Sequence, residues 1–249
     1  MARIRVLNAE IDNLTMDEAV ASVRDIALGN RKNGGESYVV TANLDHLVNL
    51  DEDATFRAAY QDAELVLPDG ISIMWLAKLQ GTPLKEKVSG SDLFPRVCSM
   101  AAEEGLSLFL LGAAPGVADI AAANILEKNP TLTIKGTYSP PFGFETDEGE
   151  IQKAIDVVTD AAPDILAIAL GDMKGEIFIW RYRSQLRVPI ALSIGATLDF
   201  EAKTKRRAPG WMSKAGLEWL YRVIQEPKRI GTRVLKDIRH LPGLIAKYR

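Results

Sequence analysis

Six short apolar runs, separated by segments with a helical pattern, constrain the fold of this 249-residue chain more than any other feature. In the run 165–170 every residue is hydrophobic, as a strand requires when both faces of its sheet are covered. We expect strands over residues 37–43, 64–68, 106–113, 131–138, 164–170 and 189–197. The segments between them predict helices over residues 16–27, 44–63, 71–79, 92–104, 116–128, 147–161 and 174–185.

Strands that alternate with helices in this way predict an α/β fold. We expect a Rossmann-like, mostly parallel sheet with helices on both faces, formed by residues 1–201. The pattern then changes, and residues 202–249 predict a C-terminal basic amphipathic helical appendage with helices broken at Pro227 and Pro242. No stretch of the chain is apolar and long enough to predict a membrane span or an export signal.

Charge is distributed unevenly along the chain. The net charge is only -3, but residues 203–249 hold 13 of the 30 basic residues and 3 of the 33 acidic ones, which leaves 17 and 30 before them. This asymmetry indicates that the appendage contacts an anionic partner; the alternative is a solvated basic helix. The single cysteine, Cys98, excludes an internal disulfide and is typical of a reducing cytoplasm.

Ligands of open parallel sheets bind at the carboxyl ends of the strands, so the residues that follow each strand are candidates. Thr41 and Asn43 could hold a sugar or phosphate oxygen, or could only cap the next helix. Asp69, followed by the adaptable Gly70, could deprotonate an acceptor hydroxyl, and helix capping is the alternative. The remaining candidates are Ser91, Asp92, Gly112, Gly116, Lys174 and Glu176.

Each of these remaining candidates has a structural alternative. Ser91 and Asp92 lie in a small polar loop that is more typical of a helix cap than of a ligand contact. The turn from Gly112 to Gly116 could present backbone amides to a pyrophosphate, but it matches neither the dinucleotide nor the Walker sequence. The loop that contains Lys174 and Glu176 could simply be solvated.

Metal and cofactor chemistry find no support in the sequence. The two histidines, His46 and His240, are far apart, and no Asp-x-Asp pair follows a strand. We therefore predict no metal site and no cofactor. A diphosphate would instead be neutralised by arginine, whose planar guanidinium suits phosphate oxygens; the appendage supplies Arg206, Arg207, Arg222, Arg229 and Arg233.

Taken in order, several motifs resemble one family, the WecG/TagA/CpsF glycosyltransferases, over about residues 6–233. The motifs are Thr41-Ala42-Asn43, Leu65-Val66-Leu67-Pro68-Asp69-Gly70, Gly90-Ser91-Asp92, Leu110-Leu111-Gly112 with Pro115-Gly116, Pro163-Asp164-Ile165-Leu166, Gly195-Ala196, Arg207-Ala208-Pro209-x-Trp211, Gly216-Leu217-Glu218-Trp219-Leu220-Tyr221-Arg222 and Glu226-Pro227-x-Arg229.

The resemblance implies an inverting, metal-independent transfer from a UDP-sugar to a polyprenyl-diphosphate-linked saccharide in cell-surface polysaccharide synthesis. Asp69 would be the catalytic base, and Thr41 and Asn43 would shape the substrate pocket. The appendage would dock on the anionic inner face of the cell membrane, so the protein would be cytoplasmic and peripheral. Its arginines, including Arg207, Arg222, Arg229 and Arg233, would meet the diphosphate. No nucleic acid is implied as a partner, and self-association stays open.

Two departures from the family pattern concern the donor. The family's usual Gly-x-Pro-Lys-Gln-Glu is Gly171-Asp172-Met173-Lys174-Gly175-Glu176 here, so an amide side chain is missing, and Lys203 stands where a glycine is expected. The donor sugar could be of the N-acetylmannosamine, glucose or uronic acid type. Two alternatives to the enzyme are a Rossmann-type oxidoreductase, against which the missing dinucleotide motif counts, and a non-catalytic membrane-associated subunit that binds lipid-linked saccharide.

Overall fold

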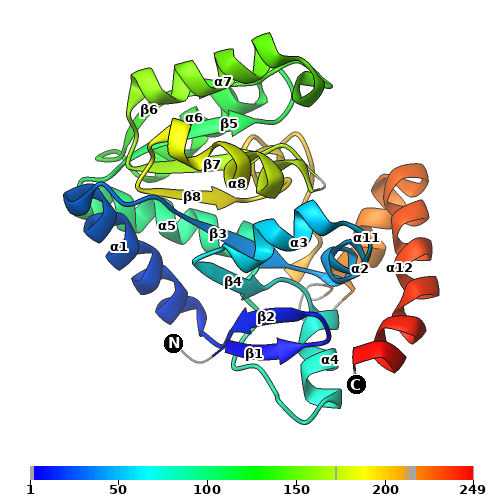
Figure 1. The fold of residues 1–249 in the computed structure, drawn as a ribbon. Helices are drawn as coiled ribbons and strands as arrows, with labels where there is room; N and C mark the ends of the chain where they lie inside the picture. Colours follow the sequence, from blue (N-terminus) through cyan, green and yellow to red (C-terminus); the bar gives the residue numbers. More distant parts are fainter. Residues whose placement is uncertain (1–2, 172, 211, 213–216, 249) are drawn as a thin grey trace.

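A six-stranded parallel sheet forms the centre of the computed structural model, which describes residues 3–171, 173–210, 212 and 217–248 (Figure 1). Its strands lie in the order β4-β3-β8-β7-β5-β6, and all their pairings are parallel. The bounds are β3 (Ser37–Ala42), β4 (Leu65–Pro68), β5 (Ser107–Gly112), β6 (Thr133–Tyr138), β7 (Ile165–Ala169) and β8 (Ile190–Ser193). The predicted α/β fold is confirmed, and the carboxyl ends of all six strands share one edge.

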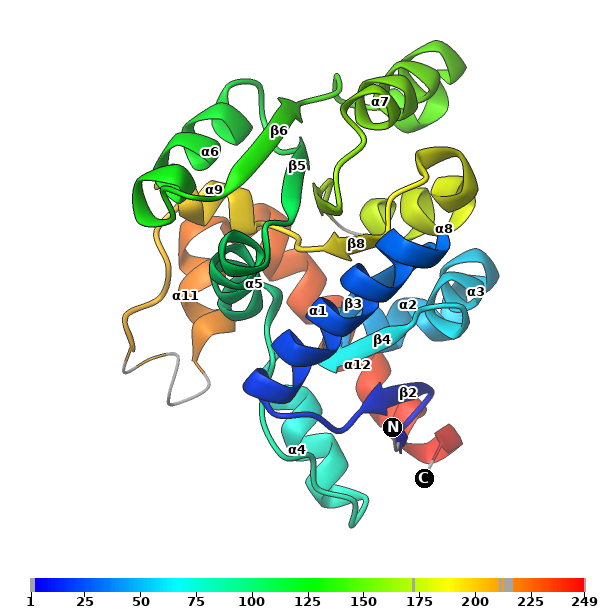
Figure 2. The ribbon, with the colours of Figure 1, turned by 90° about the vertical axis from the view of Figure 1, so that its left-hand side faces the viewer.

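Helices cover both faces of this sheet. One face, which Figure 2 turns toward the viewer, carries α1 (Met16–Asn33), α5 (Gly90–Glu104), α6 (Val117–Lys128) and α9 (Thr197–Glu201). The other face carries α2 (Leu44–Glu52), α3 (Ala54–Gln61), α7 (Glu148–Ala161) and α8 (Lys174–Leu186). Ile165 and Ala167 of β7 pack toward the first set, and Leu166 and Ile168 toward the second. Two buried faces explain why this strand is apolar throughout.

A short hairpin lies beside the edge strand β4. It consists of β1 (Arg3–Val6) and β2 (Ala9–Asp12), which pair antiparallel, and it was not predicted from the sequence. The carboxylate of Asp12 accepts a hydrogen bond of 2.8 Å from the backbone N–H of Val66 and so ties the hairpin to β4. The helix α4 (Ile71–Leu79), predicted with these bounds, packs near the hairpin, and a 3-10 turn, η1 (Phe144–Thr146), precedes α7.

Some predicted elements differ from the structure; the helix predicted over residues 16–27, for example, continues to Asn33. The segment 44–63 forms α2 and α3 rather than one helix, because the side chain of Asp53 accepts a hydrogen bond from Phe56 N (2.9 Å) and caps a new helix. The predicted strand 189–197 ends at Ser193, since Gly195 adopts a positive φ of 53° and α9 begins at Thr197.

The appendage forms α11 (Glu218–Gln225) and α12 (Pro227–Tyr248). The break at Pro227 is confirmed, but the break at Pro242 is wrong, because that proline lies inside α12. A proline within a helix costs about 3 kcal/mol; burial of Leu244 in the core, beyond the proline, offsets this cost. No helix in the described residues is long and apolar enough to cross a membrane.

The helix α12 lies against α2 (Figure 1). The ion pairs that join their surfaces include one between Lys236 Nζ and Glu52 Oε2 (2.7 Å) and one between Lys247 Nζ and Asp51 Oδ1 (2.7 Å). Part of the appendage's positive charge therefore meets acidic residues of the same chain. A division of the chain at residue 201 stays a prediction.

Candidate active site

A polar cavity of about 240 Å³ lies at the carboxyl ends of β3, β7 and β8. Each strand contributes a residue at its end, namely Thr41, Ala169 and Ser193. The appendage also lines the cavity, with the charged side chains of Lys205, Glu218, Arg222 and Arg233. The site is therefore built from the sheet edge and from the C-terminal helices together, at the position where open parallel sheets bind ligands.

A second, mainly apolar cavity of about 280 Å³ lies next to the first, between α4 and the appendage. The two cavities share five wall residues: Asn43, Asp69, Glu218, Arg222 and Arg233. Asp69 thus stands at the boundary between a polar and an apolar space.

Asp69 is held at the tip of β4 by the backbone. Its N–H donates a hydrogen bond of 2.7 Å to the carbonyl of Ala42 on β3. Gly70, which follows, has a φ of 103°, a conformation that a residue with a side chain rarely adopts. Gly70 is the cap residue of α4, and no side chain caps that helix. The capping alternative for Asp69 is therefore not realised, and its carboxylate faces the cavities.

The surroundings raise the pKa of Asp69 to about 6. Burial is the largest cause because it disfavours the charged carboxylate, and the negative charge of Glu218 adds to it. The positive charges of Lys87 and Arg222 act in the opposite direction. A carboxyl with this pKa is mostly ionised at pH 7 but binds a proton more readily than an ordinary aspartate, as suits a general base.

Thr41 and Asn43 lie beside Asp69 in the wall of the polar cavity. The side chain of Asn43 accepts a hydrogen bond from His46 N (3.0 Å) and caps α2, so capping and a place in the site occur together. His46 also lines the cavity, and its ring Nδ1 lies 2.5 Å from the hydroxyl of Tyr60. Burial lowers the pKa of His46 to about 3, which keeps its ring neutral.

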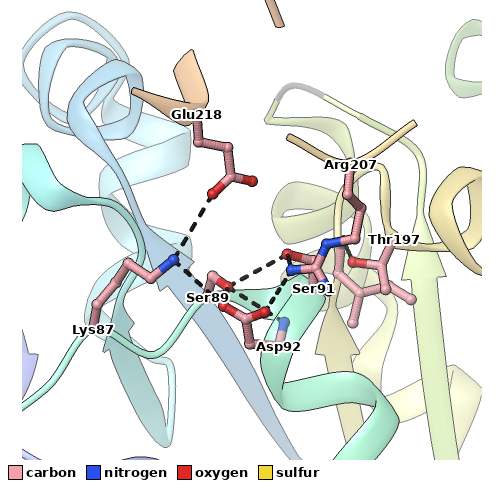
Figure 3. A network of polar contacts seen from close by, with 8 residues as sticks. Lys87, Ser89, Ser91, Asp92, Thr197, Arg207 and Glu218 are labelled. Carbon is pink, nitrogen blue, oxygen red and sulfur yellow. Dashed lines mark hydrogen bonds and ion pairs between the residues drawn. The ribbon is translucent and has the colours of Figure 1, made fainter. Parts of the chain in front are cut away.

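A network of polar contacts links the loop before α5 to the appendage (Figure 3). Lys87 Nζ lies 3.4 Å from Asp92 Oδ2 and 3.8 Å from Glu218 Oε2. The guanidinium of Arg207 donates a hydrogen bond to Ser91 Oγ (3.1 Å) and another to the carboxylate of Asp92. The loop caps α5 through Ser89, so the helix begins two residues before the predicted position, and Ser91 and Asp92 lie inside it. Of the three sequence candidates here, Ser91 lines the polar cavity, while Asp92 and Arg207 only adjoin it.

The two candidates after β7, Lys174 and Glu176, lie in the first turn of α8 and are placed differently. Glu176 is buried in the cavity wall, where its Oε1 accepts a hydrogen bond of 2.8 Å from Ser193 Oγ. Lys174 forms an ion pair with Glu145 and lies 5.0 Å from the ring centre of Phe142, so it points away from the cavity wall. Its neighbour Gly175 packs closely: a Cβ there would lie 3.0 Å from Ser193 Oγ.

The glycine turn between β5 and α6 lies outside both cavities. Gly112 has a φ of 110°, and a Cβ at this position would lie 2.5 Å from the carbonyl oxygen of Ala169. The turn thus has a packing role, and its use as a phosphate cradle stays a prediction. The side chain of Arg229 and the residues Asp172 and Trp211 lie outside what the structure describes. Across the described residues, no three His, Cys, Asp or Glu side chains form a group that could hold a metal ion.

Several wall residues were not chosen from the sequence: His46, Ser193, Lys205 and Glu218. Glu218 carried a usable signal, because it is one of only three acidic residues in the strongly basic appendage and lies within a quoted motif. His46, Ser193 and Lys205 carried no usable sequence signal, because their position in the wall depends on how distant segments of the chain meet.

The family model of the WecG/TagA/CpsF glycosyl transferases matches residues 4–249. The chain therefore belongs to this family, and it is a glycosyltransferase. It is 30% identical over 193 residues to an N-acetylglucosaminyldiphosphoundecaprenol N-acetyl-beta-D-mannosaminyltransferase of Bacillus spizizenii. The aligned segment covers 78% of this chain and 73% of the relative. It is 26% identical over 251 residues to a protein of the same name from Staphylococcus aureus, with 99% and 93% covered.

Proposed function

We propose that the protein transfers a sugar, with inversion, from a UDP-sugar to a polyprenyl-diphosphate-linked saccharide in cell-surface polysaccharide synthesis. The observation that carries the proposal is the position of Asp69. Its carboxylate has a raised pKa and forms part of the wall that the two cavities share. The printed names of the two relatives, which specify a diphosphoundecaprenol-linked acceptor, agree with it.

In this reaction Asp69 accepts the proton of the acceptor hydroxyl as its oxygen attacks the anomeric carbon of the donor. The bond between that carbon and the UDP oxygen breaks, and UDP leaves from the opposite face of the sugar. Arg222 and Arg233, in the walls of both cavities, stabilise the negative charge that develops on the leaving group. We propose that these arginines carry this charge without a metal ion.

One departure from the family's usual pattern lies behind the cavity wall, at Gly175, which packs against Ser193 but does not itself line the cavity. At Gly175 the family's usual glutamine would bring its Cβ to 3.0 Å from Ser193 Oγ, so glycine removes a side chain from the space next to Ser193. Ser193 and Glu176 then form this part of the wall by themselves. The donor sugar is of the N-acetylmannosamine, glucose or uronic acid type, and this part of the wall contributes to the choice among them.

The appendage docks the protein on the anionic inner face of the cell membrane in this proposal. Its helix α11 exposes Trp219, Leu220 and Ile224, apolar side chains that a lipid surface would cover. Replacing Trp219 and Ile224 by serine should release the protein from anionic vesicles in a flotation assay. Unchanged flotation of this double variant would show that α11 is not the contact.

The transfer reaction is tested by measuring UDP release from a panel of UDP-sugars, with a sugar diphosphate linked to polyprenol as acceptor. Asp69→Asn and Asp69→Ala should each lose about 10²-fold or more of the rate, as expected for removal of a general base. The matched control is Asp62→Asn, a carboxylate on the surface that pairs with Arg183. Activity of Asp69→Asn within a few-fold of the wild type would contradict the assignment.

A further inference from the structure

The apolar cavity is a groove with large exposed side chains. Ile71 and Trp75 of α4 form one wall, and apolar residues of the appendage form the other: Trp219, Ile230, Val234 and Ile238. Trp75 is 62% exposed and Ile238 is 56% exposed. Leaving such side chains in water is unfavourable, so an apolar ligand that covers them would gain their burial.

The groove continues directly into the polar site. Arg222 and Arg233 lie in the walls of both cavities, together with Asp69. A ligand that fills both spaces must therefore carry an apolar chain at one end and an anionic or hydroxyl-bearing group at the other. The charge at the junction matches a diphosphate, because each guanidinium can bind phosphate oxygens through paired N–H groups.

Two acidic residues also line the groove near the junction. Asp45 Oδ2 lies 3.8 Å from Arg233 Nη1 and helps to orient the guanidinium. Asp237 is 5% exposed and lies beside Asp45. Both carboxyls lie on the α2–α12 contact, so the groove is formed only when α12 is docked.

We propose that this groove binds the isoprene units nearest the diphosphate of the lipid-linked acceptor. The proposal rests on the proposed function for the identity of the acceptor, and adds a binding subsite to it. Ligand pockets typically measure about 300–1,000 Å³, and the groove, at about 280 Å³, lies just below this range. It holds only the beginning of a long prenyl chain, and the remainder lies outside the protein.

Acceptors that differ only in their lipid test this subsite. One carries a two-carbon alkyl group on the diphosphate and the other carries several isoprene units, used without vesicles and below its micelle concentration. Trp75→Ser and Ile238→Ser should raise KM for the isoprenyl acceptor about tenfold, as expected for losing part of a buried apolar contact. They should leave KM for the short acceptor unchanged.

Two matched controls separate the groove from general surface hydrophobicity. Leu79 lies one turn beyond Trp75 on α4 and is 61% exposed, and Leu235 lies on α12 and is 49% exposed, but neither lines the groove. Leu79→Ser and Leu235→Ser should retain the wild-type KM for both acceptors. If all four substitutions raised KM equally, or if KM changed only when vesicles were present, these side chains would contact the membrane and the prenyl subsite would be overturned.

A binding measurement distinguishes failure of the subsite from failure of the proposed function. The affinity for an isoprenyl diphosphate that carries no sugar can be measured by calorimetric titration, which needs no turnover. The wild type should bind it more tightly than the short-chain diphosphate, and Trp75→Ser should lose this preference. Equal affinity for both diphosphates would overturn the subsite even if transfer occurs. If light scattering shows a dimer that the Trp75→Ser substitution dissociates, the groove is occupied by a second copy of the chain, and the prenyl subsite is overturned.

Discussion

Replacing Glu218 by glutamine should shift the pH dependence of transfer toward lower pH. Glu218 lines both cavities, and its negative charge is, after burial, the largest cause of the raised pKa of Asp69. Removing that charge favours the ionised carboxylate, so the pKa of Asp69 falls. The change also removes the ion pair between Lys87 and Glu218. Lys87 can then move closer to Asp69, and its positive charge lowers the pKa of Asp69 further.

The size of the effect in the wild type follows from the pKa of about 6. A base with this pKa is about ten-elevenths ionised at pH 7 and about one-eleventh at pH 5, so kcat/KM should fall about tenfold between these values. With the ordinary aspartate value of 3.8, the same interval would change the rate by less than about 10%. In the Glu218→Gln variant, the ratio between pH 7 and pH 5 should lie between these limits.

The assay is initial UDP release at subsaturating donor and acceptor, at constant ionic strength, so that kcat/KM of the free enzyme is followed. Glu226→Gln is the matched control, because Glu226 ends the same helix and pairs with Lys205. It should leave the midpoint unchanged. A wild-type profile that is flat between pH 5 and pH 7, or a Glu218→Gln midpoint equal to or above that of the wild type, would refute the reasoning.

Three further predictions concern the frame of the site and its chemistry. Gly112→Ala should destabilise the fold by about 3 kcal/mol in urea unfolding, because its Cβ would lie 2.5 Å from the carbonyl oxygen of Ala169; Gly116→Ala, with open space around it, should cost only about 1 kcal/mol. Asp237 has a pKa raised to about 7, mainly by burial, so its ionisation lowers stability as pH rises from about 4 through 7. Asp237→Asn should therefore raise the urea midpoint at pH 8 and leave it unchanged at pH 4; a gain at both values would contradict the assignment. Transfer should persist after dialysis against EDTA, and loss of activity that added Mg²⁺ restores would show that the arginines do not suffice.

Most of the sheet could be predicted because β3, β4, β5, β7 and β8 are almost fully buried and are therefore mainly apolar runs, whereas the edge strand β6 is only partly buried. The hairpin of β1 and β2 could not, because its turn carries no glycine signal and Leu7 adopts a positive φ of 53° there. The run 189–197 concealed a strand end, a turn and the start of α9, because its residues are mostly apolar and buried except at Gly195 and Ala196 in the turn. Pro242 misled the prediction because the core contact of Leu244 beyond it cannot be inferred from local sequence.

The candidate site could be predicted in part for a geometric reason. Thr41, Asn43 and Asp69 follow strands that end at one edge, so the pattern of the sheet alone brings them together. The place of Glu218 depends on how the appendage folds back over that edge. The same folding pairs basic residues of α12 with acidic residues of α2. The uneven charge of the chain is thus partly satisfied within one molecule.

The two cavities draw their walls from different stretches of the chain. The polar one is formed mainly by the strand ends and the loops after them, and the apolar one mainly by α4, α11 and α12. On the proposed roles of the two cavities, the lipid preference is encoded mainly in these helices, while the donor preference depends on the sheet edge and also on the appendage residues that line both cavities. Exchanging the C-terminal helices and α4 between two members of the family should therefore move the prenyl-chain preference with them, and it would also exchange Glu218, Arg222 and Arg233 in the wall of the polar cavity.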